Sequence, residues 1–164
     1  MRVIGIDPGY GRLGFAVVES DGGGLQSIGS GVIETDAKLD LASRLLEVYA
    51  SVGELVTRYS PDSAAIERQM FVTNRTTGLD VAKAVGVVML RFAESSVPIF
   101  EYTPTEVKMT VSGSGHADKK QIEFMVKQIL KLDSIPKLDD ETDAMAVAIC
   151  HAHSVRMKSL HRVK

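Results

Sequence analysis

Apolar and polar positions alternate along the first part of the chain. Residues 3–6 form an apolar run that ends at the turn sequence Asp7-Pro8-Gly9, which predicts a buried strand. Larger apolar residues alternate with smaller ones over residues 13–17, which predicts a second strand antiparallel to the first. A third strand is expected over residues 28–33. Three strands with no helix between them are typical of a meander.

The period then changes to that of amphipathic helices. Apolar residues recur at intervals of three and four and predict helices over residues 41–55, 81–92 and 122–130. A last helix is expected to begin at Asp139 or Asp140 and to run toward His153.

Two short apolar runs and one capping signal complete the pattern. Residues 63–66 and 97–102 predict two more strands, and Thr103-Pro104-Thr105-Glu106 carries the signals of a helix start. The order of elements predicts an α/β fold. Its mixed five-stranded sheet, flanked by helices, is antiparallel in the first three strands and parallel where helices intervene.

Length and composition fit one globular domain. The chain has 164 residues, of which 45% are apolar and 24% charged, and a single domain is expected over residues 1–155. One cysteine, Cys150, excludes an internal disulfide framework. No apolar run is long enough to cross a membrane and no signal peptide is evident, so a cytoplasmic location with no membrane partner is expected.

Net charge argues weakly against a nucleic-acid partner. The sum is −2, whereas DNA-binding proteins usually carry a basic excess. Local distribution decides binding, however, and residues 156–164 form a basic tail with no acid. Both a solvated chain end and a DNA-contacting tail remain open for this segment.

Two acids follow apolar strands. Asp7 ends the first strand and Glu67 ends the fourth, and ligands of α/β proteins gather at the carboxyl ends of strands. Each acid alone could be a turn or cap residue. The pair favours a functional site, because Glu is neither a turn-former nor a good strand residue.

Two further acids lie at the start of the last helix. Asp140 and Asp143 are three residues apart and share a helix face, either as cap residues or as ligands. The small apolar residues that follow predict tight packing against a sheet, which would carry Asp143 toward the core. Carboxylates that meet there without an obvious cationic partner suit Mg²⁺ or Mn²⁺. Two such ions would support phosphoryl displacement.

Five groups of motifs stand in order along the chain. They are Gly5-Ile6-Asp7-Pro8-Gly9; Ile66-Glu67-Arg68; Phe100-Glu101-Tyr102-Thr103-Pro104 with Glu106-Val107-Lys108; Gly113-Ser114-Gly115 before Ala117-Asp118-Lys119; and Asp140-Glu141-Thr142-Asp143-Ala144-Met145-Ala146 with Cys150-His151-Ala152-His153. Together they closely resemble the RuvC family of bacterial Holliday-junction resolvases, over residues 1–155.

The resemblance implies a ribonuclease-H-like fold, a homodimer and a magnesium-dependent crossover junction endodeoxyribonuclease. Such an enzyme makes paired symmetric nicks in a four-way DNA junction during recombination and repair, beside the RuvA–RuvB branch-migration complex. Two Mg²⁺ ions per subunit are implied, for which Mn²⁺ can substitute. Asp7, Glu67, Asp140 and Asp143 match the family's catalytic metal ligands.

The resemblance also implies DNA contacts. Lys108 and Lys119 match basic residues that contact DNA at the active site. A family aromatic that inserts into the junction falls at Met70, with Phe71 next to it, and a core or interface role for Phe71 is the alternative. From the sequence itself, Arg68, Asn74 and Arg75 flank a polar loop after Glu67 and are candidate phosphate contacts, with an ordinary solvated loop as the alternative.

Three other classes share part of this pattern. Actin-like ATPases open with a similar Gly-Ile-Asp turn but need a second lobe, for which 164 residues leave no room. A YqgF-like nuclease relative has a similar opening, although the later motifs fit RuvC better. A non-enzymatic junction-binding scaffold is the third alternative, and the intact acids argue against it.

Overall fold

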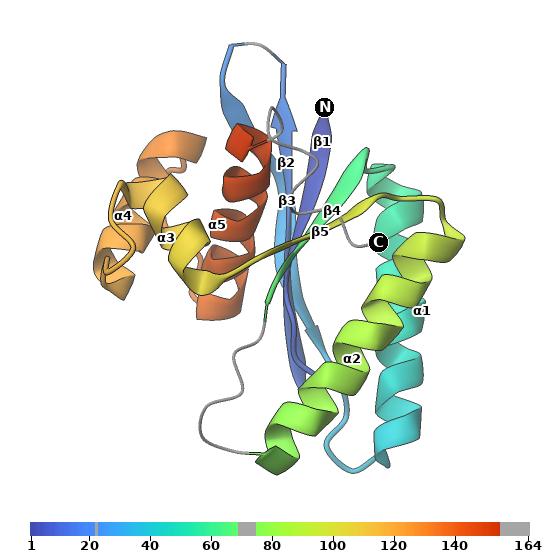
Figure 1. The fold of residues 1–164 in the computed structure, drawn as a ribbon. Coiled ribbons are helices and arrows are strands. Elements are labelled where there is room, and N and C mark those ends of the chain that lie inside the picture. The colour runs from blue at the N-terminus through green and yellow to red at the C-terminus, as the bar shows by residue number, and fades with distance from the viewer. Residues whose placement is uncertain (22, 69–74, 155–164) are drawn as a thin grey trace.

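The computed structural model describes residues 1–21, 23–68 and 75–154 as a sheet with helices on both faces (Figure 1). The strands are β1 (Arg2–Asp7), β2 (Arg12–Ser20), β3 (Leu25–Glu34), β4 (Ser63–Glu67) and β5 (Ile99–Tyr102). The helices are α1 (Leu41–Tyr59), α2 (Arg75–Glu94), α3 (Pro104–Ser112), α4 (Lys119–Leu130) and α5 (Asp139–Ser154).

The sheet has the strand order β3-β2-β1-β4-β5. The pairs β1–β2 and β2–β3 are antiparallel, and the pairs β1–β4 and β4–β5, which helices connect, are parallel. This arrangement confirms the mixed five-stranded sheet expected from the order of elements.

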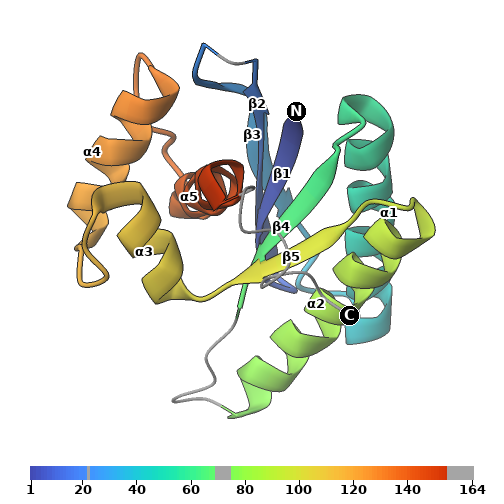
Figure 2. The ribbon, with the colours of Figure 1, turned by 45° about the horizontal axis from the view of Figure 1, so that its top comes forward.

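The helices divide between the two faces of the sheet. Figures 1 and 2 show α1 and α2 on one face and α3, α4 and α5 on the other. Each face of the sheet has its own hydrophobic core, and the side chains of β1 point to the two cores alternately. Ile4 and Ile6 are buried with α1 and α2, and Val3 is buried with the other three helices. Such alternation is the expected consequence of the two-residue period of a strand.

Two glycines let α5 lie directly on the sheet. A Cβ atom at Gly5 in β1 would overlap the carbonyl oxygen of Ala144 and stand 2.7 Å from the backbone nitrogen of Ala148. A Cβ atom at Gly14 in β2 would overlap the carbonyl oxygen of Asp140. The first turns of α5 therefore touch the backbones of β1 and β2.

Most element boundaries follow the sequence signals. Thr103 and Glu106 form both halves of a capping box at the start of α3, and α5 begins at Asp139. Helix α2 begins at Arg75, before the expected range, because its first turn is polar and offers no apolar period. The candidate residues Met70, Phe71 and Asn74 and the basic tail lie outside the described residues.

His151 is a core residue. The neighbouring histidines of the last helix turn suggest a role at the helix terminus from the sequence alone. In the structure His151 is 1% exposed, and its ring nitrogens lie 3.0 Å from Ser63 Oγ and 2.7 Å from Tyr102 Oη. The ring joins α5 to β4 and β5, which is a packing role.

No helix among the described residues is long and apolar enough to cross a membrane.

Gly5→Ala is expected to destabilise the protein by about 1–3 kcal/mol, because the added methyl must push α5 away from β1. Gly86→Ala is the matched control: Gly86 lies in α2 with open space around its Cβ position, so alanine should stabilise that helix by up to about 1 kcal/mol. Urea unfolding of both variants measures the two effects. Equal behaviour of the two variants would show that the Gly5 contact carries no constraint.

Candidate active site

Strand pairing brings Asp7 and Glu67 to one edge of the sheet. Ile6 of β1 is in register with Ile66 of β4, and the two strands run parallel. The residue after each isoleucine, Asp7 or Glu67, therefore leaves the sheet beside the other. This is the placement at strand ends that the sequence predicted.

The other two acids arrive through α5. Asp7 is paired across the β1–β2 ladder with Gly14, and Gly14 lies directly under the backbone of Asp140. The close approach of α5 thus brings Asp140 over the strand that neighbours Asp7. Asp143 follows three residues later on the same helix and lines the adjacent pocket.

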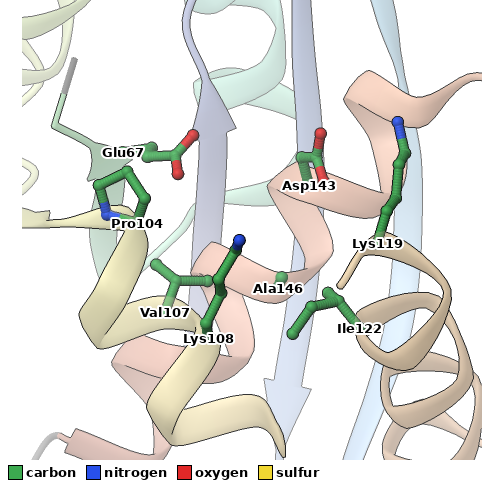
Figure 3. A pocket seen from close by; sticks show the side chains of 8 residues that line it. All are labelled: Glu67, Pro104, Val107, Lys108, Lys119, Ile122, Asp143 and Ala146. Carbon is green, nitrogen blue, oxygen red and sulfur yellow. The ribbon is translucent and has the colours of Figure 1, made fainter. Parts of the chain in front are cut away.

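An open pocket of about 230 Å³ lies between α3, α4 and α5. Figure 3 shows Glu67 and Asp143 at its rim, Lys108 reaching toward them from α3, and Lys119 beside Asp143 at the start of α4. Apolar side chains of α3 and α4 line the pocket below these charged groups. The site therefore combines carboxylates and ammonium groups above an apolar floor.

Burial and mutual repulsion act on the carboxylates together. Burial, followed by the charges of Glu67, Asp143 and Asp140, raises the pKa of Asp7 to about 8. Burial also raises the pKa of Glu67 and the pKa of Asp143. Nearby acids raise both values further. Both effects disfavour the ionised forms, so a cation at this site would be stabilised by all of these groups.

Three successive acids in the first turn of α5 each contact a different element. Asp139 forms an ion pair with Lys119 of α4, and Asp140 Oδ2 lies 3.2 Å from Nη2 of Arg12 in β2. Ser30 of β3 donates a hydrogen bond of 2.9 Å to Glu141 Oε2. These contacts fix the helix start against the sheet and α4.

The cationic partners correct one expectation. No cationic partner for the carboxylates was expected from the sequence, yet Arg12 is paired with Asp140. The charge of Lys119 also opposes the rise that burial causes in the pKa of Asp7 and of Asp143. Arg12 lies two residues before Gly14, and Gly14 is paired with Asp7 across the two strands. Only this strand register shows that Arg12 lies near the acids.

The carboxylates do not form a closed cage. Within residues 1–21, 23–68 and 75–154, no three Asp, Glu, His or Cys side chains form a group that could hold one ion as they lie. Asp7 and Asp140 are not among the residues that line the pocket of Glu67 and Asp143. Like charges favour this separation, and a bound cation would draw the groups together.

A family model described as crossover junction endodeoxyribonuclease RuvC matches residues 3–151. The chain belongs to the RuvC family. A family member from Alkaliphilus metalliredigens is 45% identical over 164 residues, which is all of both chains. A second, from Thermosipho melanesiensis, is 46% identical over 95% of this chain and 99% of its own. Both bear the name crossover junction endodeoxyribonuclease RuvC.

Solved structures agree with this assignment. The structure described as T. thermophilus RuvC in complex with Holliday junction substrate superposes with a TM-score of 0.94 at 33% identity, covering 99% of each chain. The family is one of divalent-metal-dependent nucleases with a ribonuclease-H-like fold, which confirms the fold expected from the motifs.

Metal-free Asp7→Asn is expected to be more stable than the wild type at pH 8, and the difference should shrink toward pH 4. The Asp7 carboxyl group ionises near pH 3.8 in the unfolded chain and near 8 in the fold. The fold therefore favours the protonated carboxyl group. Its contribution to the free energy of unfolding is complete below pH 3.8 and is lost as pH rises to 8. Asparagine does not titrate, so its advantage grows over that window to the order of a few kcal/mol.

Urea unfolding in EDTA at pH 4, 6, 8 and 9 measures this dependence. Glu54→Gln, at an exposed position of α1, removes a carboxylate far from the site and should show no such growth. A constant difference between Asp7→Asn and wild type at all four pH values would contradict the raised pKa.

Proposed function

We propose that this chain resolves Holliday junctions by paired symmetric nicks through metal-dependent phosphodiester hydrolysis, leaving 5′-phosphate and 3′-hydroxyl ends. The observation that carries the proposal is the gathering of four partly buried acids and two lysines around the carboxyl ends of β1 and β4. Membership of the RuvC family and the junction-bound relative support the substrate. Recombination and repair of DNA are the processes in which such a reaction is needed.

The donor set fits hard divalent cations. Its atoms are carboxylate oxygens, the ligands that Mg²⁺ and Mn²⁺ prefer, and the raised pKa of Asp7 reports an excess of buried negative charge. Asp140 Oδ2 is buried and accepts no hydrogen bond from the described residues. We assign Asp7, Glu67, Asp140 and Asp143 as the residues that would hold two Mg²⁺ ions, with Asp7 as the acid that would be shared by both.

Two bound ions would supply an activated water and stabilise the leaving 3′-oxygen. The protein's own groups orient the phosphate. Lys108 and Lys119 project into the pocket from α3 and α4, where their ammonium groups can pair with non-bridging phosphate oxygens. The hydrogen bond from Lys119 to Asp139 raises the pKa of Lys119, so this ammonium group stays charged.

Paired nicks require two active sites, so a homodimer is part of the proposal. A four-way junction presents two equivalent strands, and a two-fold dimer would present one site to each. Cooperation with the RuvA–RuvB complex follows from the family resemblance and stays a prediction. So do the DNA contacts at Met70, Phe71, Asn74 and Arg75.

Glu67→Gln should abolish junction cleavage while junction binding persists, because glutamine keeps the shape but removes the charge. We expect a loss of more than about a hundredfold, since even outer-shell partners of metal ligands contribute roughly 10- to 100-fold. Glu101→Gln is the matched control, because Glu101 lies on β5 in register with Ile66 and is paired with Arg68 at 3.8 Å. It should cut at near the wild-type rate.

The measurement is nicking of a mobile four-way junction in Mg²⁺, with products mapped at nucleotide resolution. A Glu67→Gln enzyme that cuts like the wild type would refute the metal-site assignment. A wild-type protein that binds the junction without nicking it would instead be a junction-binding scaffold.

Lys108→Ala and Lys119→Ala should each slow cleavage and make junction binding less sensitive to salt. Each lost phosphate contact should flatten the log–log dependence of the binding constant on salt by about one unit. Lys83→Ala on α2, where Lys83 is paired with Asp80, is the control and should leave both quantities unchanged. Unchanged salt dependence and unchanged cleavage rates for the two pocket variants would show that neither lysine contacts the phosphate.

A further inference from the structure

Arg12 is an ionic partner of Asp140. Its Nη2 atom lies 3.2 Å from Asp140 Oδ2, and the contact is an ion pair without hydrogen-bond geometry, since Oδ2 accepts no hydrogen bond from the described part of the chain. The arginine side chain is 53% exposed and the aspartate 20%. A half-exposed cation thus faces a less exposed anion.

The sheet register explains why the guanidinium reaches this carboxylate. Arg12 opens β2, two residues before Gly14, so both lie on the same face of the strand. Gly14 is the position over which the Asp140 backbone packs. Any long side chain at position 12 is therefore directed toward the first turn of α5.

The neighbouring ion pairs are different in kind. Lys119 is paired with Asp139 and Arg68 with Glu101, and neither acid is assigned to the metal. Those two cations can keep their partners when the site is loaded. Arg12 is paired with an assigned ligand, so the same oxygen would have to serve the guanidinium and the metal.

We infer that Arg12 is a positioning residue that acts through Asp140: it neutralises this carboxylate in the metal-free enzyme, competes with the divalent ion for it, and turns out toward solvent when the ion binds. The inference rests on the proposed role of Asp140 as a ligand. Half-exposed ion pairs contribute little to stability, so the exchange is energetically accessible.

Arg12→Gln should therefore bind Mn²⁺ about two- to fivefold more tightly in the absence of DNA, the range expected when a competing surface ion pair is removed. The direction is diagnostic, because a residue that merely supported the fold of the site would weaken metal binding when removed. Arg12→Lys should remain near the wild type, since it keeps a competing charge.

Titration of the full-length variants with Mn²⁺, followed by electron paramagnetic resonance of the free ion, measures this affinity. Arg68→Gln is the matched control: it removes a positive charge next to Glu67 whose partner is not an assigned ligand. It reports the general effect of charge, and Arg12→Gln should exceed it. An Arg12→Gln affinity equal to that of Arg68→Gln, or weaker than wild type, would overturn the inference.

The Asp140→Asn background separates this inference from the proposed function. If Asp140 is a ligand, Asp140→Asn weakens Mn²⁺ binding, and Arg12→Gln added to it changes the affinity by no more than the general charge effect that Arg68→Gln reports. Weakened binding by Asp140→Asn with no gain from Arg12→Gln alone refutes only the role of Arg12. Unchanged binding by Asp140→Asn refutes the ligand assignment, and the role of Arg12 with it.

Discussion

The contact between α5 and the backbones of β1 and β2 is the constraint on which the site depends. At Gly5 and Gly14 no side chain separates the helix from the strand backbones, so Asp140 is held over the partner of Asp7 in the strand ladder. A side chain at either glycine would push α5 off the sheet and move Asp140 away from the strand beside Asp7. The packing of small residues and the gathering of charge are therefore one structural feature.

That gathering is costly for the metal-free fold. Burial and repulsion raise the pKa of three carboxylic acids, and the groups do not converge into a closed cage. The first turn of α5 offsets part of the cost through its contacts with Lys119, Arg12 and Ser30. The carboxylates thus destabilise the metal-free fold at the place where a divalent ion would stabilise it, as in many functional sites.

The sequence predicted what depends on local pattern. Acids at strand ends marked Asp7 and Glu67, and the capping box at Thr103 fixed the start of α3. The partner of Asp140 could not be found in this way, because Arg12 meets it through a ladder register and a helix–sheet contact between residues far apart in the chain. The packing role of His151 was missed for the same reason, because its partners lie on β4 and β5.

Local charge also resolves the apparent conflict between a net charge of −2 and a DNA substrate. The carboxylates and lysines of the pocket roughly balance while the acids are ionised and metal-free, and they offer a phosphate little attraction. Under the proposed function, divalent ions at the carboxylates reverse that balance, and Lys108 and Lys119 then add to a positive site. The negative charge that argues weakly against a DNA partner would then be the means of concentrating metal, so that phosphate binding at the pocket becomes favourable once the ions are in place.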